Sequence, residues 1–473
     1  MVFSSAIFVF FFLPITLIGY FLMHHKGKNI WLLAMSLFFY FWGGGYSLFP
    51  IIIYSILLNY ISGILLEYFD KRYLYRIRKT TFWISIFLNL MMLGYWKYAV
   101  FLLQSVKNLT GWQIVIPEII LPIGISFFTF QGMSYVIDVY RKEAPAQRSL
   151  QKLGLYISLF PQLVAGPIVR YTDIRNQLTS RNHNVEKFAS GIRLFAIGLA
   201  KKTIIANSVA VVADDIFGLR PWQNTPSVAW LGLICYVFQI YFDFSGYSDM
   251  AVGLGKMFGF QFPQNFNYPY ISQSVTEFWR RWHISLSSWF RDYVYIPLGG
   301  SRKGNVYLNL FVIFLLTGIW HGASWNFVLW GVYHGIFIVI ERYMSKHLGK
   351  RIKIPGLICW VYTMFIWSMS MVLFRTETLE NCILYMRSLY GMISVRDVGF
   401  TLSYYIHSYE IFIFIVSLIA MLPLGKKFYV FLRKSWPEVL ITVMADIIAL
   451  GLIGLSILYI VTGTYNPFIY FQF

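Results

Sequence analysis

Two stretches within residues 276–326 decide how this chain folds. The first is Thr276-Glu-Phe-Trp-Arg-Arg-Trp-His-Ile-Ser-Leu-Ser-Ser-Trp-Phe-Arg-Asp-Tyr-Val-Tyr-Ile-Pro-Leu-Gly-Gly300, an aromatic and basic segment. The second follows a short apolar run, 306–319, and is Trp320-His-Gly-Ala-Ser-Trp-Asn326. Ionisable groups are costly in or beside membrane-embedded sequence, so His283 and His321 are functional candidates.

Composition extends this membrane interpretation to the whole chain. Of the 473 residues, 58% are hydrophobic and only 12% are charged. A soluble domain usually carries about 25% charged residues, so most of the chain is expected to lie in lipid. The first 23 residues have neither a basic leading region nor a small-residue cleavage site, so we interpret them as a retained first helix.

The apolar segments predict an all-α integral membrane protein with about 11–12 transmembrane helices, at roughly 20 apolar residues for each span. Several of the segments are short for a full span and would be tilted or half-embedded. They lie near residues 4–23, 30–42, 48–67, 82–104, 119–139, 191–213, 228–250, 306–319, 325–341, 355–375, 408–424 and 440–462.

The distribution of positive charge explains the net charge of +19 without nucleic acid. With the N-terminus outside, the inward loops hold about 30 Lys and Arg residues and the outward loops about four, as the positive-inside rule requires. We therefore expect both termini on the extracytoplasmic side of a bacterial cytoplasmic membrane, with the lipid bilayer as a partner and no nucleic acid.

A single domain, 1–473, is expected, because no linker or repeat stands out. Two inward segments are too long for simple loops. Residues 140–190 contain an apolar run broken by Pro161, Gly166 and Pro167, which predicts a re-entrant segment. The second segment, 251–305, shows helical spacing of five residues, Phe278, Trp282, Ser285, Trp289 and Tyr293. An interfacial helix with an aromatic belt would explain this spacing.

The histidines are the main candidates for chemistry. The run before His321 is short for a span, so His321 is expected below the outer surface, where a desolvated neutral imidazole can accept a proton. A histidine hydrogen-bonded between helices is the alternative, and His283 can pair with His321, contact a ligand or bond locally. No metal site is expected, because the histidines lack ligand spacing and the cysteines, Cys235, Cys359 and Cys382, are scattered.

Further candidates lie in a predicted helix and at the chain end. Asp243 and Asp249 need partners in the membrane and can orient a histidine, clamp an arginine or form a structural salt bridge. The aromatic tail, residues 466–473, is expected outside, either as an interface anchor or through Tyr470, whose hydroxyl can bear an acyl ester.

Long motifs in one order give the chain a resemblance to the membrane-bound O-acyltransferases, in the branch of alginate and peptidoglycan O-acetyltransferase membrane subunits. The resemblance covers nearly the whole chain. The motifs include Phe160-Pro-Gln-Leu-Val-Ala-Gly-Pro167, Tyr241-Phe-Asp-Phe-Ser-Gly-Tyr-Ser-Asp249, Asn265-Phe-Asn-Tyr-Pro-Tyr270, Phe278-Trp-Arg-Arg-Trp-His-Ile-Ser285, Tyr295-Ile-Pro-Leu-Gly-Gly300 and Trp320-His-Gly-Ala-Ser-Trp325.

The resemblance implies a ring of tilted helices around a tunnel, with His321 as the catalytic residue and His283 as a second active-site residue. Acetyl-CoA would enter from the cytosol as the donor substrate, with no bound cofactor. Arg280 or Arg281 would meet its phosphates. The supporting residues expected along the tunnel are Trp320, Gly322, Trp282, Ser285, Asp243, Asp249 and Tyr295.

The tail resembles the C-terminal motif of a small partner protein in the related D-alanyl branch. This implies that His321 acts as a base for Tyr470, which passes the acetyl group to an extracytoplasmic SGNH-type partner and on to a cell-surface or secreted polysaccharide. Two alternatives stay open. One is D-alanyl transfer to teichoic acid, and the other, from a different class, is a polysaccharide transporter or flippase, although no inverted repeat is found.

Overall fold

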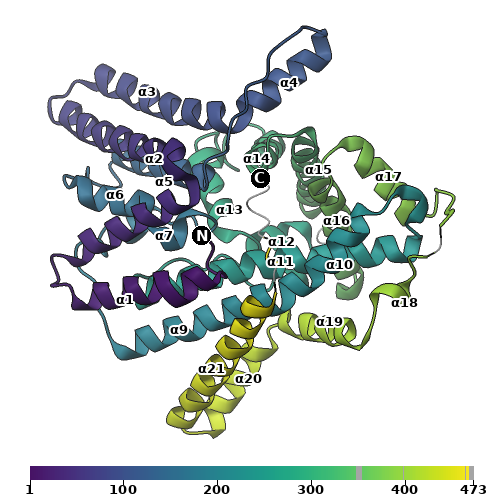
Figure 1. The fold of residues 1–473 in the computed structure, drawn as a ribbon. Coiled ribbons are helices and arrows are strands. Elements are labelled where there is room, and N and C mark those ends of the chain that lie inside the picture. Colours follow the sequence, from purple (N-terminus) through teal and green to yellow (C-terminus); the bar gives the residue numbers. More distant parts are fainter. Residues whose placement is uncertain (348–353, 398, 464, 468–473) are drawn as a thin grey trace. The chain divides into compact units, whose positions relative to one another are not determined.

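The computed structural model describes residues 1–347, 354–397, 399–463 and 465–467, and this part of the chain contains helices and no strand (Figure 1). Seven of its helical runs are long and apolar enough to cross a membrane, and one bent pair would make eight. The runs are Lys28–Lys71, Tyr75–Thr110, Val185–Gly218, Pro226–Met257, Trp325–His347, Gly356–Arg375 and Glu438–Thr462, and the pair is Ser408–Ala420 with Leu424–Ser435. The all-helical membrane fold is thereby confirmed.

The number of long helices is smaller than the 11–12 spans that the sequence predicts. Segments 30–42 and 48–67 belong to one helical run, α2 (Lys28–Lys71), which is kinked at Gly45, where φ is 65°. Segment 119–139 gives only α5 (Ile125–Arg141), whose residues from Ile125 to Val139 are all buried. The runs Phe8–Leu22 and Val306–His321 are apolar but short. Apolar sequence thus reflects burial inside the protein as well as contact with lipid.

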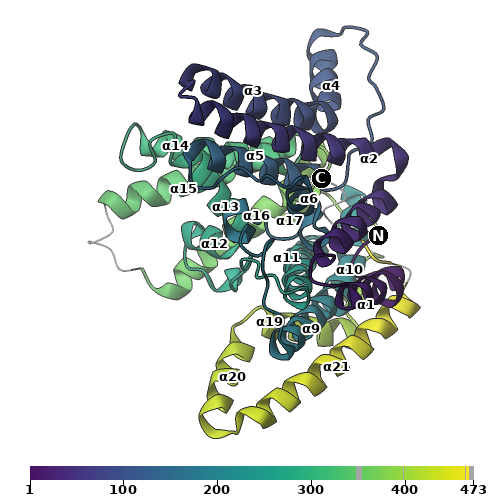
Figure 2. The ribbon, with the colours of Figure 1, turned by 90° about the vertical axis from the view of Figure 1, so that its left-hand side faces the viewer.

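The described chain divides into two compact units. The first consists of Met1–Phe195 and Met250–Pro263. In it, α2 and α3 lie side by side (Figure 2) and are joined by paired amides, with Asn59 Nδ2 3.2 Å from Asn89 Oδ1. Its other elements are η1 (Phe8–Phe12), α1 (Leu13–Leu22), α3 (Tyr75–Leu93), η2 (Gly94–Tyr98), α4 (Ala99–Thr110), α6 (Leu150–Ser158), α7 (Phe160–Leu163), α8 (Tyr171–Ile174) and the start of α9 (Val185–Ala200).

The expected re-entrant segment, 140–190, belongs to the first unit. It forms α6, α7 and α8, with a break at Leu159 and no helix between Val164 and Arg170. Every residue from Leu153 to Val169 is buried. Pro161 lies in the first turn of α7, Gly166 and Pro167 lie in the non-helical stretch, and this irregular backbone is buried.

The second unit consists of Ala196–Asp249 and Gln264–Phe473. It carries the residues that the sequence proposes for chemistry. Its elements are η3 (Lys201–Ala206), α10 (Asn207–Gly218), η4 (Pro221–Gln223), most of α11 (Pro226–Met257), η5 (Pro269–Ile271), α12 (Val275–Arg281), α13 (Ile284–Phe290), η6 (Arg291–Tyr295), α14 (Val306–His321), α15 (Trp325–His347), α16 (Gly356–Arg375), α17 (Leu379–Leu389), α18 (Leu402–Tyr405), α19 (Ser408–Ala420), α20 (Leu424–Ser435) and α21 (Glu438–Thr462).

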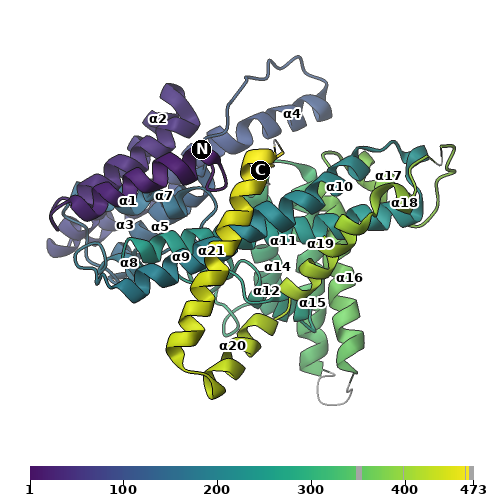
Figure 3. The ribbon, with the colours of Figure 1, turned by 60° about the horizontal axis from the view of Figure 1, so that its bottom comes forward.

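Two glycines bring α14 and α15 into backbone contact, while α15 and α16 lie side by side (Figure 3). A Cβ atom on Gly318 would lie 2.8 Å from the Cα of Gly331, and one on Gly331 would lie 2.6 Å from the carbonyl oxygen of Phe314. Neither approach tolerates a larger side chain. This tight pairing fixes the end of α14, where His321 is located.

The aromatic segment 276–300 is not one interfacial helix. It forms α12, α13 and the π-helical turn η6, with a break at Trp282 and His283. His283 has φ of 42°, in the left-handed region that few non-glycine residues adopt. Phe278, Trp282, Trp289 and Tyr293 are buried, so the expectation of an aromatic belt at the lipid interface is wrong for these side chains.

Candidate active site

His283 is held at the turn between α12 and α13 by Asn265. The imidazole Nδ1 lies 3.1 Å from Asn265 Oδ1, and the same oxygen accepts from the backbone N–H and the hydroxyl of Ser285, at 3.2 and 2.9 Å. The Asn265 amide nitrogen donates to the Ser248 hydroxyl at 3.0 Å. The strained backbone of His283 is therefore fixed from outside its own helix, as expected at functional sites.

These contacts define the tautomer of His283. A backbone N–H can only donate, so the Ser285 N–H identifies the atom facing it as the Asn265 carbonyl oxygen. His283 Nδ1 must then carry a proton and donate it, which leaves a lone pair on Nε2 of the neutral ring. Nε2 is buried and has no hydrogen-bond partner among the described residues. Burial lowers the pKa of His283 to about 3, so the ring is neutral near pH 7.

His321 is the last residue of α14 and is also buried. Its ring centroid lies 6.5 Å from that of His283 and 5.1 Å from that of Trp320. Trp330 of α15 and Phe374 of α16 cover it edge-on, at 5.0 and 5.3 Å. The structure thus brings together the two histidines that the sequence selects, in an aromatic enclosure.

Three of the proposed supporting residues lie around this pair. Trp320 contacts both rings, with its centroid 5.9 Å from that of His283. Gly322 is in contact with the Phe327 ring, so a Cβ atom at Gly322 would clash. Ser285 completes the Asn265 network.

Trp282 lies one layer further from the histidines. Its ring packs on Trp367 at 4.7 Å and on Phe266 at 5.0 Å. Phe244 of α11 separates it from the site, because Phe244 contacts both Trp282, at 6.4 Å, and His283, at 4.7 Å. Trp282 therefore supports the wall that encloses His283.

Asp243 and Asp249 form ion pairs with consecutive lysines. Asp243 Oδ1 lies 2.9 Å from Lys202 Nζ, with both side chains almost fully buried, and Asp249 Oδ2 lies 2.7 Å from Lys201 Nζ. Both lysines begin the π-helical turn η3. The salt-bridge alternative considered for these acids is therefore present, with lysine as the partner.

A cavity of about 950 Å³ lies among the helices that carry the histidine pair, although neither histidine lines it. Its lining side chains come from α12, α13, η6, α14, α15, α16 and their connections and include Arg280, Arg291, Tyr295, Thr317, Glu341 and Arg342. Thr317 is one helical turn before His321. Trp279, also in the lining, packs on Trp330 at 5.6 Å, and Trp330 packs on His321. The indoles of Trp279 and Trp330 thus lie between this cavity and His321.

The two donor candidates differ in their surroundings. Arg280 lines the cavity. Arg281 instead pairs with Glu277 at 2.8 Å and donates to the carbonyl oxygen of Asn267 at 3.2 Å. Glu341 accepts from the backbone N–H groups of Val275 and Thr276, at 2.6 and 2.8 Å, and so fixes the start of the helix that carries Arg280.

Asn265 and His334 complete the surroundings of the site, and only the role of Asn265 was missed from the sequence. Asn265, visible only as part of a motif, sets the tautomer of His283. His334 of α15 accepts a hydrogen bond from the Trp279 indole at 3.4 Å and packs on Trp330 at 4.7 Å, which agrees with a packing or orienting role. Tyr470 lies outside the described residues. Among those residues, no group of three or more His, Cys, Asp or Glu side chains could hold a metal ion.

The long apolar helices define the chain as an integral membrane protein with two histidines buried among aromatic rings. The family model of the membrane-bound O-acyltransferases (MBOAT) matches residues 80–376, and the chain belongs to this family. It is 39% identical to the probable alginate O-acetylase AlgI of Pseudomonas putida over the whole of both chains.

Two other relatives mark the range of similarity. A peptidoglycan O-acetyltransferase of Helicobacter pylori is 35% identical over 84% of this chain and 81% of its own. A teichoic acid D-alanyltransferase of Bacillus subtilis is 30% identical over 50% of this chain and 62% of its own. The chain is therefore an O-acyltransferase by family.

Proposed function

We propose that this protein takes acetyl groups from cytosolic acetyl-CoA and passes them across the membrane for O-acetylation of a cell-surface or secreted polysaccharide. The observation that carries the proposal is the buried pair of His283 and His321, with ring centroids 6.5 Å apart. The names of the Pseudomonas putida and Helicobacter pylori relatives support acetyl as the group and a polysaccharide as the final acceptor.

In this proposal His321 is the catalytic base. It takes the proton of an acceptor hydroxyl, whose oxygen forms an ester bond with the acetyl carbonyl carbon as the thioester C–S bond breaks. The proton then passes from His321 to the departing sulfur, which restores the neutral imidazole and releases CoA. His283, with its Nε2 lone pair, accepts a hydrogen bond from a reacting group or from the protonated His321. Trp320, Trp330 and Phe374 exclude water, which would otherwise hydrolyse the acetyl group.

The cavity lined by Arg280 is the proposed donor site. Its volume, about 950 Å³, is within the range of cofactor pockets. Arg280 would meet phosphates of acetyl-CoA, since guanidinium groups bind phosphate through paired hydrogen bonds. Arg291 also lines the cavity, but its guanidinium is already paired with Asp292, at 2.6 and 3.0 Å. The acetyl end would then pass between Trp279 and Thr317 toward His321. Arg281 is assigned to holding α12 through Glu277 instead.

Tyr470 is the proposed first acceptor. It follows Pro467 by three residues, so its Cα can lie at most roughly 11 Å from that of Pro467. An acetyl-tyrosine would hand its group to an extracytoplasmic SGNH-type partner. The excess of Lys and Arg in the predicted inward loops supports extracytoplasmic termini in a bacterial cytoplasmic membrane.

Transfer of radiolabelled acetyl from acetyl-CoA to the partner tests the proposal, with wild type compared with His321→Ala. Transfer by wild type and its loss in the variant are expected. Equal transfer by both would remove His321 from the mechanism. The Bacillus subtilis relative makes D-alanyl the competing donor group. Labelled D-alanyl supplied on its carrier protein, if transferred in place of acetyl, would reassign the donor.

A further inference from the structure

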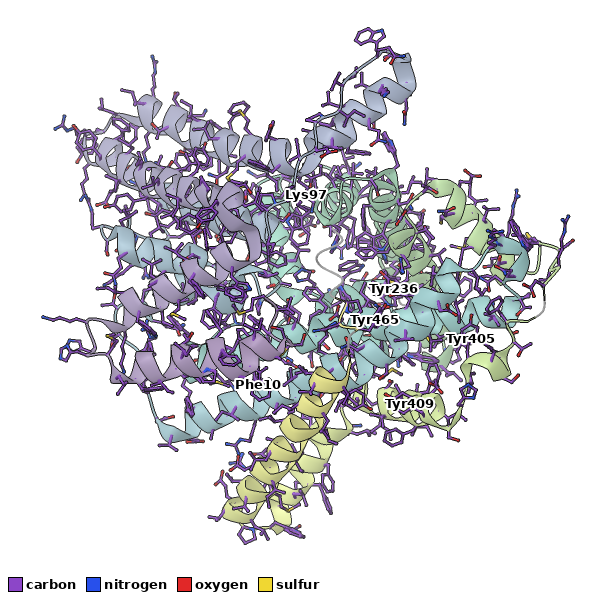
Figure 4. The ribbon with its side chains drawn as sticks, in the orientation of Figure 1. Phe10, Lys97, Tyr236, Tyr405, Tyr409 and Tyr465 are labelled. Atoms are coloured by element: carbon purple, nitrogen blue, oxygen red, sulfur yellow. The ribbon has the colours of Figure 1, made fainter. Side chains whose placement is uncertain are left out.

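The end of the described chain is fastened to the second unit by three side-chain contacts. After α21, Tyr465, which Figure 4 labels, donates its hydroxyl proton to Asp214 of α10. Asn207 Nδ2 donates to Asn466 Oδ1 at 3.4 Å. Lys202 Nζ donates to the carbonyl oxygen of Pro467. Three consecutive tail residues are thus held by residues of η3 and α10.

The contact with the Pro467 carbonyl is made by a buried charge, the ammonium of Lys202. Lys202 and Asp243 form a 2.9 Å ion pair with side chains only 3% and 2% exposed. A buried ion pair usually adds little net stability, because desolvation offsets the attraction of the charges. An ammonium has three N–H donors, and the Pro467 carbonyl accepts from one that Asp243 does not use. The pair therefore offers a fixed donor to a backbone carbonyl of the tail.

Asp214 is also held by a residue of a neighbouring helix. Arg375, the last residue of α16, donates to Asp214 Oδ1 at 2.7 Å, while Tyr465 uses Oδ2. The Arg375 guanidinium lies over the rings of Phe217 and Tyr236, at 5.4 and 5.8 Å. Both carboxylate oxygens of Asp214 thus have partners, and one of these partners is the tail.

The position of the anchor relates it to the histidine pair. Asp243 directly precedes Phe244 on α11, and the Phe244 ring packs edge-on against His283 at 4.7 Å. The Pro467 carbonyl is therefore bound through Lys202 to the same turn of α11 that walls His283. The remaining six residues of the chain start from this point.

We propose that Lys202, Asp243, Asn207 and Asp214 form a docking site for the protein's own C-terminal segment, residues 465–467, and act as positioning residues for acyl transfer. This inference rests on the proposed function, because it gives the anchored tail the task of presenting an acyl acceptor. The site recognises a backbone carbonyl through an ammonium, a side-chain amide through an amide, and a phenol through a carboxylate.

The adjacent pair of Lys201 and Asp249 provides a matched control. It is an ion pair of similar length in the same π-helical turn, and the Lys201 ammonium donates to Asp249 rather than to one of the described tail residues. Lys202→Met with Asp243→Asn removes both charges of the anchor, so no unpaired charge stays buried. Lys201→Met with Asp249→Asn makes the corresponding change beside it.

Crosslinking measures docking directly. Asn207→Cys with Asn466→Cys replaces the amide contact and keeps the contacts of Lys202 and Asp214 in every protein compared. In a Cys359→Ser background the two cysteines are joined by a short bifunctional thiol reagent, and the yield is read by mass spectrometry of the full-length protein. We expect a high yield in the parent and in the Lys201–Asp249 control. We expect a yield at least threefold lower in the Lys202–Asp243 variant, and equal yields in the two double variants would overturn the proposal.

The rate of acetyl transfer, measured beside the crosslinking yield, distinguishes loss of tail docking from loss of the catalytic base. The Lys202–Asp243 variant is expected to transfer acetyl at least fivefold more slowly than its control, and crosslinking its tail should restore most of the rate. His321→Ala should crosslink normally and stay inactive. If His321→Ala transfers acetyl normally, His321 is not the base, and if wild type transfers no acetyl, the proposed function fails. In both cases the crosslinking yield still decides docking. A Lys202–Asp243 variant that docks poorly and yet transfers at the control rate would exclude a positioning role.

Discussion

His283 and Lys202 are both buried ionisable side chains of the second unit, yet their surroundings differ. The Lys202 ammonium is matched by Asp243 and by the Pro467 carbonyl. The His283 ring is matched on one side only, where Nδ1 donates to Asn265, and Nε2 has no hydrogen-bond partner among the described residues. Buried polar groups whose hydrogen bonds are all made stabilise the fold. A buried acceptor with no hydrogen-bond partner, such as Nε2, is available to a substrate or another reacting group.

This difference predicts which changes alter chemistry and which alter stability. Near the histidines, a substitution should change the rate of transfer with little effect on folding. At the lysine pairs, it should change the free energy of unfolding or the position of the tail first.

The largest effect is expected for His321→Ala. Loss of a general base typically lowers a rate by about 10²- to 10⁴-fold, and the rate of labelled acetyl transfer should fall in this range. The melting temperature in detergent should change little, because the imidazole is enclosed by aromatic rings that stay in place. His347→Ala, at the exposed end of α15, is the control and should be fully active. A His321→Ala protein that unfolds well below the control would indicate a mainly structural role.

The next effect is expected for Lys202→Met as a single change. It leaves the Asp243 carboxylate buried without its cation, and breaking a buried pair costs about 3–5 kcal/mol. Chemical denaturation followed by tryptophan fluorescence should show this loss. Adding Asp243→Asn should recover much of it, since the charge is then removed from both partners. If the single variant is as stable as wild type, the pair is more hydrated than its burial indicates.

The sequence identifies the two histidines better than it identifies the lysine ion pairs. His283 and His321 are identified from their motifs because ionisable residues in apolar sequence are rare and therefore informative. The left-handed backbone of His283 and its bond to Asn265 are not predicted. They depend on an extended segment 18 residues earlier returning to the turn. The lysine partners of Asp243 and Asp249 are missed for the same reason, since they lie on a different helix.

The number of spans shows a second limit of the sequence. Hydropathy cannot distinguish α5, which is covered by protein, from a helix that faces lipid, since both are apolar. Nor can it separate two spans from one kinked run such as α2, where the break at Gly45 becomes visible only in the backbone angles. The choice of Arg280 over Arg281 as the cavity residue likewise depends on where Glu277 lies.

A smaller effect concerns acid stability. Burial holds the pKa of His283 at about 3, below the usual 6.5, so between these values the unfolded chain binds the proton and the folded protein does not. Stability should therefore fall as pH drops from about 6.5 toward 3, with His283 contributing roughly 1–3 kcal/mol of loss by about pH 4.5. His283→Gln keeps a donor for Asn265 and cannot be protonated. Melting temperatures at pH 7 and 4.5 should differ less for this variant than for wild type, and an equal difference would contradict burial of a neutral imidazole.

The smallest effect is expected at two neighbouring arginines of α12, one lining the cavity and one in an ion pair. Arg280 lines the cavity, whereas Arg281 is matched by Glu277 and the Asn267 carbonyl. One charge-assisted hydrogen bond to a phosphate contributes about 1.5–3 kcal/mol when buried and less at an open cavity, so Arg280→Ala should raise KM for acetyl-CoA by roughly 3- to 10-fold with kcat nearly unchanged. Arg281→Ala should leave KM unchanged and lower stability slightly, because it releases the Glu277 carboxylate that otherwise ties the start of α12 to its end. Initial rates over a range of acetyl-CoA concentrations separate the two variants. A KM effect in Arg281→Ala alone would place the donor phosphates on the other side of α12 and remove the cavity from the donor path.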